Sequence, residues 1–218
     1  NDARLEGYRS ITATGTDNIS NMHYFRNTAT LKDGDLVLMD YAPDYKYYAS
    51  DVTRTYPVGG RFSGAARDVY QAVLSAQAAA FAAIAPGVTL PQMHAAALRE
   101  LVVGLVALGA LAGDVDELIQ TESYKPFYMH TTGHLLGLDV HDVGSTFVDG
   151  KPRALEPGIC FTIEPGLYFS RTEPKTPEHL RGIGVRIEDD VVLTESGFEN
   201  LTAAIPKEIA DVEAWMRS

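Results

Sequence analysis

The feature that most constrains this chain is an alanine-rich block, residues 64–113, between two segments that favour strands. Apolar residues recur along its first part at the spacing of one helix face: Val69, Val73, Ala76 and Ala80. Prolines and a glycine within 86–91 interrupt the pattern, because these residues end helices, and Thr89 is placed to cap a second helix with Pro91 in its first turn. We therefore expect two consecutive helices in this block.

The segments on either side of the block are typical of short strands. Residues 1–62 are rich in Thr, Tyr, Asn, Asp and Gly, and residues 126–205 return to short apolar stretches separated by turns. No repeat or linker-like stretch divides the chain. The sequence therefore predicts one α+β domain, in which antiparallel strands carry a helical layer, and a short terminal helix within 207–217.

The charge of the chain excludes some classes of partner. Its 18 basic and 29 acidic side chains give a net charge of −11, whereas nucleic acids and anionic membranes are bound by basic surfaces. The longest apolar run, residues 101–113, is shorter than the roughly 20 residues of a membrane span and predicts a buried helix. The single cysteine, Cys160, cannot form an intrachain disulfide, and we expect a cytoplasmic protein.

Two aspartates in the N-terminal part are candidates for metal binding. Asp40 ends the apolar run 36–39, where an unpaired carboxylate is costly to bury. A hairpin loop centred near residues 45–46 would place Asp40 directly opposite Asp51. Like charges in that position destabilise a sheet, whereas a divalent cation between them reverses the effect. A shifted register would separate the two, so the hairpin alone leaves a metal site and a solvated acidic face equally open.

Three of the six histidines lie within twelve residues: His130, His134 and His141. One histidine among apolar neighbours is usually a core residue, but three together favour metal binding or acid–base chemistry. Farther along, Glu164 ends an apolar strand before a Pro-Gly turn and is expected to be buried.

A further acidic group lies within residues 184–192. Strand alternation places Arg186, Glu188 and Asp190 on one face, with Asp189 on the other. Arg186 could also do no more than pair with a neighbouring carboxylate.

Together these positions supply one histidine and four carboxylates: Asp40, Asp51, His134, Glu164 and Glu188. Oxygen-rich ligands suit Mn²⁺, Co²⁺ or Mg²⁺, and a lone cysteine excludes a structural thiolate zinc site. Four carboxylates over-neutralise one dication but balance two. This charge balance predicts a dinuclear centre, in which two ions flank and acidify a bridging water.

Several long segments resemble the pita-bread metallopeptidases, which include methionine aminopeptidase, prolidase and aminopeptidase P, and the likeness is greatest to aminopeptidase P, the Xaa-Pro aminopeptidase. The motifs are His23-Tyr24, MDYAPDYKYYASDVTRTYPVGGRF at 39–62, GDVDELI at 113–119, HTTGHLLGLDVHDVG at 130–144, LEPGICFTIEPGLYF at 155–169 and RGIGVRIEDDVVLTESGFENLT at 181–202. This chain departs from the family's usual sequence at two places, Thr131-Thr132 and the segment MDYAPDY. Both lie beside the site, and neither removes a ligand.

The resemblance implies a pita-bread fold, a curved antiparallel sheet covered by helices in two pseudo-two-fold halves. Residues 1–218 would form the metallopeptidase catalytic domain, with first-half strands in 1–62 and the second half in 64–205. The family's first helical pair and N-terminal domain have no counterpart in this chain. We therefore expect a piece of a longer protein, with one apolar sheet face uncovered.

The resemblance also implies roles for the five candidate ligands. Asp40 would bind one metal ion, His134 and Glu164 would bind the other, and Asp51 and Glu188 would bridge the two. The ions would be two divalent cations, Mn²⁺ first, with Co²⁺ or Zn²⁺ as alternatives.

Further residues would act on the substrate. Glu164 would take the proton of the bridging water. His23 and His141 would bind the scissile carbonyl and the gem-diolate and would help to protonate the leaving imino nitrogen, which a tertiary amide requires. The implied substrate-binding residues are His130, Tyr168 and Arg186.

The implied activity is that of a dinuclear exopeptidase that hydrolyses the bond between an N-terminal residue and proline, acting as a homo-oligomer (dimer or tetramer). One alternative is prolidase, which uses the same five ligands on Xaa-Pro dipeptides. Alternatives of another kind are a non-catalytic pita-bread module that binds peptides or proteins, and a metal-independent relative such as creatinase. Both of these lack the complete ligand set that this chain keeps.

Overall fold

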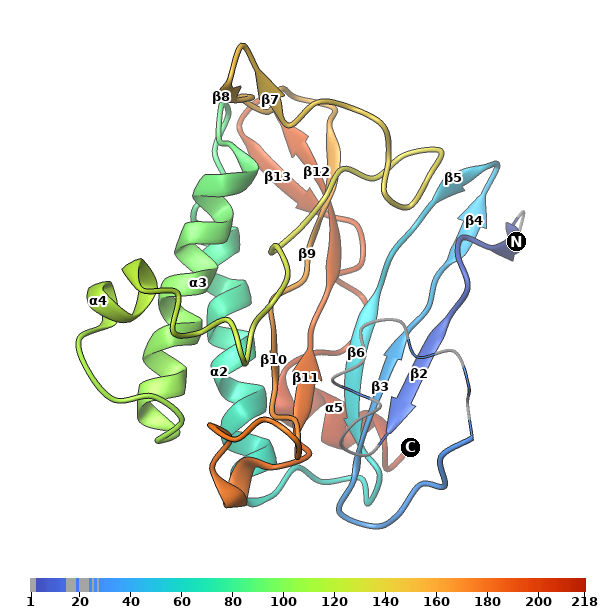
Figure 1. The fold of residues 1–218 in the computed structure, drawn as a ribbon. Helices are drawn as coiled ribbons and strands as arrows, with labels where there is room; N and C mark the ends of the chain where they lie inside the picture. The colour runs from blue at the N-terminus through green and yellow to red at the C-terminus, as the bar shows by residue number, and fades with distance from the viewer. Residues whose placement is uncertain (1–2, 15–18, 20–23, 25, 27) are drawn as a thin grey trace.

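The computed structural model of the protein describes residues 3–14, 19, 24, 26 and 28–218. Figure 1 shows a helical layer beside one group of strands, with a second group of strands farther from the helices. The helices are α2 (Gly64–Ala82), α3 (Leu90–Ala107), α4 (Val115–Gln120), the 3₁₀ turn η1 (Glu178–Leu180) and α5 (Ile209–Trp215). All strand pairings among the described residues are antiparallel, as expected for the α+β class.

The N-terminal strands form two small sheets. The order in one is β2–β3–β6, and in the other β1–β4–β5. Their bounds are β1 (Ala3–Glu6), β2 (Ile11–Thr14), β3 (Leu36–Asp40), β4 (Pro43–Tyr45), β5 (Tyr48–Ala49) and β6 (Thr53–Pro57). β11 of the C-terminal part contacts both β3 and β6, so the two halves of the chain meet there.

The C-terminal strands form a three-stranded sheet of order β13–β12–β9 and the pairs β10–β11 and β7–β8. Their bounds are β7 (Phe147–Val148), β8 (Lys151–Pro152), β9 (Cys160–Ile163), β10 (Gly166–Tyr168), β11 (Gly184–Arg186), β12 (Asp189–Thr194) and β13 (Gly197–Asn200). α2 packs against β9, β10 and β11 (Figure 1). The predicted return to strands from residue 126 was wrong at its start, because residues 121–146 hold only a single bridge, Leu135 to Phe161.

The helical block forms as predicted. The four residues assigned to one face of the first helix are buried in α2. The Thr89 side chain accepts a hydrogen bond from the Gln92 amide, and the Gln92 side chain accepts one from Thr89, which completes a capping box at α3. Gly104 lets α3 approach α2, since a Cβ there would lie 2.8 Å from the Ala72 Cβ.

The apolar run 101–113 is only partly the buried helix that we expected. α3 ends at Ala107, and the chain then turns at Gly109 and Gly113, which have φ angles of 71° and 136°. Leu101 and Leu105 are fully buried, but Val103 is 43% exposed. No described helix is long and apolar enough to cross a membrane.

The hairpin register also differs from the prediction. Asp40 pairs with Thr53 rather than with Asp51, because the turn is centred one residue later, between Lys46 and Tyr47. This shift moves the partner by two residues. Since side chains alternate along a strand, positions 51 and 53 stay on the same side, and Asp51 lies diagonal to Asp40 instead of opposite it.

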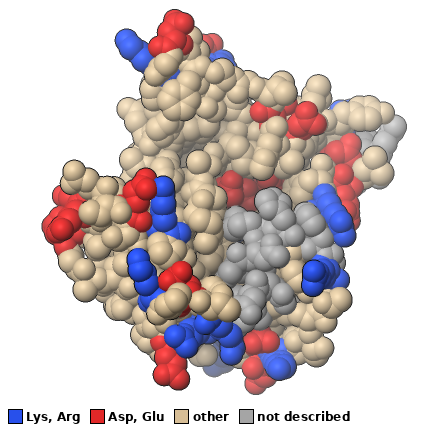
Figure 2. Space-filling view, in the orientation of Figure 1, with Lys and Arg blue, Asp and Glu red and all other residues tan. Residues whose placement is uncertain are grey.

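Apolar side chains remain exposed near the β2–β3–β6 sheet. Met39, Tyr41 and Trp215 are between 41% and 54% exposed and line a hollow of about 430 Å³. On the face drawn in Figure 2, Lys and Arg side chains lie interspersed with Asp and Glu, and the described residues of that face form no continuous basic surface.

The Thr89 cap gives a direct test of the helical layer. Thr89→Ala removes the side-chain acceptor of the Gln92 amide and should lower the free energy of unfolding by about 1 kcal/mol. Thr89→Ser keeps the acceptor and should stay close to the wild type. Urea unfolding followed by circular dichroism measures both, and equal destabilisation by the two variants would contradict a capping role.

Candidate active site

Four segments of the chain converge at one place between the two groups of strands. Asp51 lies just before β6, Glu164 directly after β9, and Glu188 between β11 and β12. The histidine segment runs beside β9, where the Thr162 amide donates to the His134 carbonyl (2.9 Å) and the Glu164 amide donates to the Thr132 carbonyl (2.7 Å). Backbone pairing therefore fixes how the His134 side chain faces Glu164.

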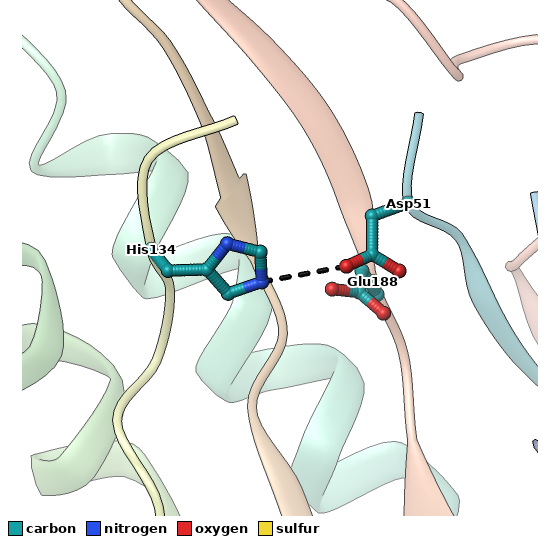
Figure 3. Close-up of side chains that lie close together, drawn as sticks. All are labelled: Asp51, His134 and Glu188. Atoms are coloured by element: carbon teal, nitrogen blue, oxygen red, sulfur yellow. Dashed lines mark ion pairs between the residues drawn. The ribbon is translucent and has the colours of Figure 1, made fainter. Parts of the chain in front are cut away.

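The side chains of these segments form a compact cluster. Figure 3 shows the His134 imidazole directed at Asp51 and Glu188. His134 Nε2 lies 3.3 Å from Asp51 Oδ2 and 3.6 Å from Glu164 Oε1. Potential ligand atoms of Asp51, His134 and Glu188 all lie within 4.8 Å of one another. This spacing is suited to ligands that share a cation.

The cluster contains an unsatisfied acceptor. Asp51 Oδ1 is buried and has no hydrogen-bond partner among the described residues, whereas Asp51 Oδ2 faces His134. A buried acceptor without a donor is unfavourable, and a bound cation would remove that cost. The carboxylate and imidazole donors of this cluster therefore fit a divalent metal ion.

Asp40 is arranged differently from the other predicted ligands. The Tyr8 hydroxyl donates to Asp40 Oδ1, and Arg186 Nη2 lies 2.5 Å from Oδ2. Arg186 thus does pair with a neighbouring carboxylate, the alternative that the sequence left open, and it also donates to the Tyr168 hydroxyl (3.1 Å). The structure places Asp40 next to the cluster and outside the group of three that could share one ion.

The acidic side chains resist ionisation together. Burial first, and then the negative charges of Asp51, Glu164 and Asp40, raise the pKa of Glu188 well above its usual value. Burial also raises the pKa of Glu164 to about 7, although Arg186 and His134 oppose the shift. The pKa of Asp40 is raised by burial against the opposing charge of Arg186. When no cation is bound, protons neutralise part of this negative charge.

The histidines occupy distinct environments. Burial and the charge of Arg186 lower the pKa of His130 to about 3, so this ring is neutral, and its Nε2 lies 2.9 Å from the Tyr168 hydroxyl. For His134, burial acts to lower the pKa, but Asp51 and Glu164 reverse the effect and raise it. The His134 and His141 rings lie 4.1 Å apart, beside a cavity of about 450 Å³ that Leu135 and Phe147 also line.

The structure thus brings nine of the ten predicted residues into one connected region. Direct contacts link Asp51, Glu164, His130 and Tyr168 to His134 or to each other, and Arg186 joins Asp40 to Tyr168. Glu188 belongs to the group of three potential ligands, and the His141 ring lies beside the His134 ring at a tilt of 55°. His23, the tenth, lies outside the described residues.

Sequence reasoning missed three supporting residues. Thr53 donates to Glu188 Oε2 (2.6 Å) and accepts from Arg186 Nε (3.1 Å), and strand alternation from Asp51 could have identified it. Asp190, which the sequence placed on the correct face without a role, accepts from the Asp51 amide (3.0 Å), and burial raises its pKa to about 7. Tyr8 comes from a distant segment, and no sequence pattern pointed to it.

Comparison with known proteins defines the class of this chain. Residues 1–195 match the family described as Metallopeptidase family M24, and the chain belongs to that family. Its fold is the pita-bread fold, as the sequence predicted. Its use of a divalent metal ion agrees with the cluster described above.

Individual relatives give a narrower likeness. The chain is 50% identical over 214 residues to the Xaa-Pro aminopeptidase of Haemophilus influenzae, and the aligned region covers 98% of this chain and 49% of that protein. It is similar to the structure of Pseudomonas aeruginosa aminopeptidase PepP (TM-score 0.96, 51% identity, 99% of this chain and 48% of that one). It is also similar to zinc-substituted Escherichia coli aminopeptidase P in complex with product (TM-score 0.94, 46% identity, 99% and 48%). The chain spans about half the length of the relatives it matches.

The raised carboxyl pKa values predict how stability changes with pH when metal is removed. At Glu164 the folded state binds the proton more tightly than the unfolded chain does, so the contribution of this group to stability is present below its unfolded pKa of 4.5 and is lost as the pH rises towards about 7, by about 1–3 kcal/mol. Chelator-treated protein can be unfolded by urea across this range. Glu164→Gln should remove this contribution, so the difference in stability between the wild type and the variant should change with pH over this range, and a difference that does not change with pH would contradict the assignment.

Proposed function

We propose that the protein containing this chain is a metal-dependent exopeptidase that releases the N-terminal residue from peptides with proline at the second position. The observation that carries the proposal is the cluster of Asp51, His134 and Glu188 beside Glu164, in a chain that shares 50% identity with an Xaa-Pro aminopeptidase. All five predicted ligand positions are occupied by the expected residue types.

We propose a centre of two divalent ions, with Mn²⁺ preferred over Co²⁺ or Zn²⁺. Asp51 and Glu188 would bridge the ions, His134 and Glu164 would complete one side, and Asp40 would serve the other. The charges support this, because four buried carboxylates balance two dications. When bound, the ions would polarise the scissile carbonyl and lower the pKa of a water molecule.

The residues of the chain would then handle the protons and hold the substrate. Glu164, with a pKa of about 7, is suited to accept a proton near neutral pH. The neutral His130 ring, the Tyr168 hydroxyl and the Arg186 guanidinium form one connected row of polar groups, in which His130 would contact the peptide and the two buried side chains would support it. His141, next to His134, is our candidate for protonating the leaving nitrogen, and we propose the same for His23 on the resemblance alone.

Two further proposals concern the location and the assembly of the protein. We propose that the protein acts in the cytoplasm and as a homo-oligomer.

A substrate-length series tests the activity. With Mn²⁺ present, the purified protein should release the first residue from an Xaa-Pro-Xaa tripeptide, and an Xaa-Ala-Xaa tripeptide serves as the control. Released amino acids can be quantified by chromatography. Cleavage confined to the Xaa-Pro dipeptide would indicate prolidase instead, and a protein that binds these peptides without cleaving them would be a binding module.

Substitution of the bridging candidates tests the metal centre. Asp51→Asn and Glu188→Gln each remove a charge and one of the two carboxylate oxygens, so they should weaken Mn²⁺ binding and turnover by more than the roughly 10–100-fold typical of an outer-shell partner. Metal content by mass spectrometry and rate assays measure the two effects. Glu199→Gln makes the same charge change at an exposed position of β13 and should behave like the wild type. Full metal content in either ligand variant would refute the assignment.

A further inference from the structure

A buried glutamine on α2 contacts the backbone just before both glutamates of the site. The Gln77 side chain is 1% exposed, and its Nε2 donates to the carbonyl of Ile163 and to the carbonyl of Ile187, at 3.2 Å each. These residues immediately precede Glu164 and Glu188. One amide group therefore bridges the two segments that carry these carboxylates, from the side of the sheet that faces α2.

An arginine on β6 holds Glu188 itself. Arg54 is 2% exposed, and its five N–H groups make five hydrogen bonds. Two of them, from Nη1, reach the carbonyls of Glu188 (2.5 Å) and Thr53 (3.0 Å). Thr53 in turn donates its hydroxyl to the Glu188 carboxylate, so the backbone of both partners is fixed by the same guanidinium.

Asp189 and Lys207 hold these two side chains in orientation. Asp189 is fully buried; its Oδ1 accepts from Arg54 (2.7 Å) and its Oδ2 accepts from Gln77 (3.0 Å) and Lys207 (2.6 Å). Lys207 also donates to Gln77 Oε1 (2.9 Å) and lies over the Phe81 ring. Because Oε1 is held by an ammonium group, Nε2 is directed at the two carbonyls. We refer to Arg54, Gln77, Asp189 and Lys207 as the support cluster.

Helix packing alone does not require a polar side chain at position 77. The buried neighbours of Gln77 on α2 include Val73, Leu74, Ala76 and Ala80, all apolar. A buried amide must be matched by hydrogen bonds, and an apolar side chain of the same size would fill the space without that demand. The partners that Gln77 uses lie at the strand ends that lead into the site.

We propose that Gln77 and Arg54 are positioning residues of the metal centre, which set the separation of Glu164 and Glu188 by holding the peptide carbonyls next to them. This inference rests on the proposed metal-binding function. The two carboxylates repel each other, and the pair must nevertheless be held at a spacing that suits a shared centre. The hydrogen bonds from the support cluster oppose that repulsion through the backbone, without contact to metal or substrate.

The test compares the Mn²⁺ affinity of variants in the support cluster with that of a variant that is destabilised away from it. Gln77→Met keeps the size and removes every hydrogen bond of the side chain, whereas Lys207→Met leaves Asp189 paired with Arg54 and Gln77 but removes the donor to Gln77 Oε1. Calorimetric titration of metal-stripped protein should show affinity about 10–100-fold weaker in Gln77→Met, as for other outer-shell partners, and a smaller loss in Lys207→Met. Leu105→Ala, which leaves a cavity under α3, should lower thermal stability and keep the wild-type affinity.

The outcomes separate the inference from the function on which it rests. If Gln77→Met and Lys207→Met both bind Mn²⁺ within twofold of the wild type, or if Leu105→Ala loses as much affinity as they do, the positioning role is refuted and the function stands. If the wild type itself binds no Mn²⁺, the proposed function fails, and the inference fails with it. Should Gln77→Met not fold, Lys207→Met alone decides between these results.

Discussion

Mutual repulsion among buried carboxylates is the constraint on which the rest of this structure depends. Burial, and then the negative charges of neighbouring carboxylates, including that of Asp51, raise the pKa values of Glu188, Glu164 and Asp40. Carboxylates packed this closely are stable only where hydrogen-bond donors, cations or protons offset their negative charge. Arg186, Tyr8, Thr53 and His134 supply this compensation in the described chain, and each comes from a different segment. The sheets and α2 can be understood as the framework that holds those segments together.

The carboxylates of the site differ in how many of their oxygens have a hydrogen-bond or ion-pair partner. Asp40 has both oxygens occupied, one by the Tyr8 hydroxyl and one by the Arg186 guanidinium. Asp51 has one oxygen facing His134 and one without a hydrogen-bond partner among the described residues. A cation therefore binds more favourably near Asp51 and Glu188 than near Asp40. The negative charge of Asp40 is already paired with Arg186, whereas less of the charge at Asp51 and Glu188 is neutralised.

The sequence predicted most of the local structure and identified nine of the residues that the structure brings together. Periodicity located α2 and the Thr89 cap of α3, and strand alternation placed Arg186, Glu188 and Asp190 on one face and Asp189 on the other. The partner of Asp40 was wrong by two residues, because turn geometry at residues 46–47 set the register. Tyr8, Gln77 and Lys207 could not be predicted, since their contacts join positions far apart in the chain and follow no local period.

The two sides of the segment 186–190, where β11 leads into β12, have different environments. On one face, Arg186, Glu188 and Asp190 meet the cluster, where polar groups remain only partly compensated. On the other, Asp189 has all four of its acceptor positions occupied by Arg54, Gln77, Lys207 and Thr202. A fully paired network is rigid, whereas a partly paired one retains capacity for a ligand. Adjacent residues of the short segment 186–190, where β11 leads into β12, thus give the site both its partly compensated charge and its fixed shape.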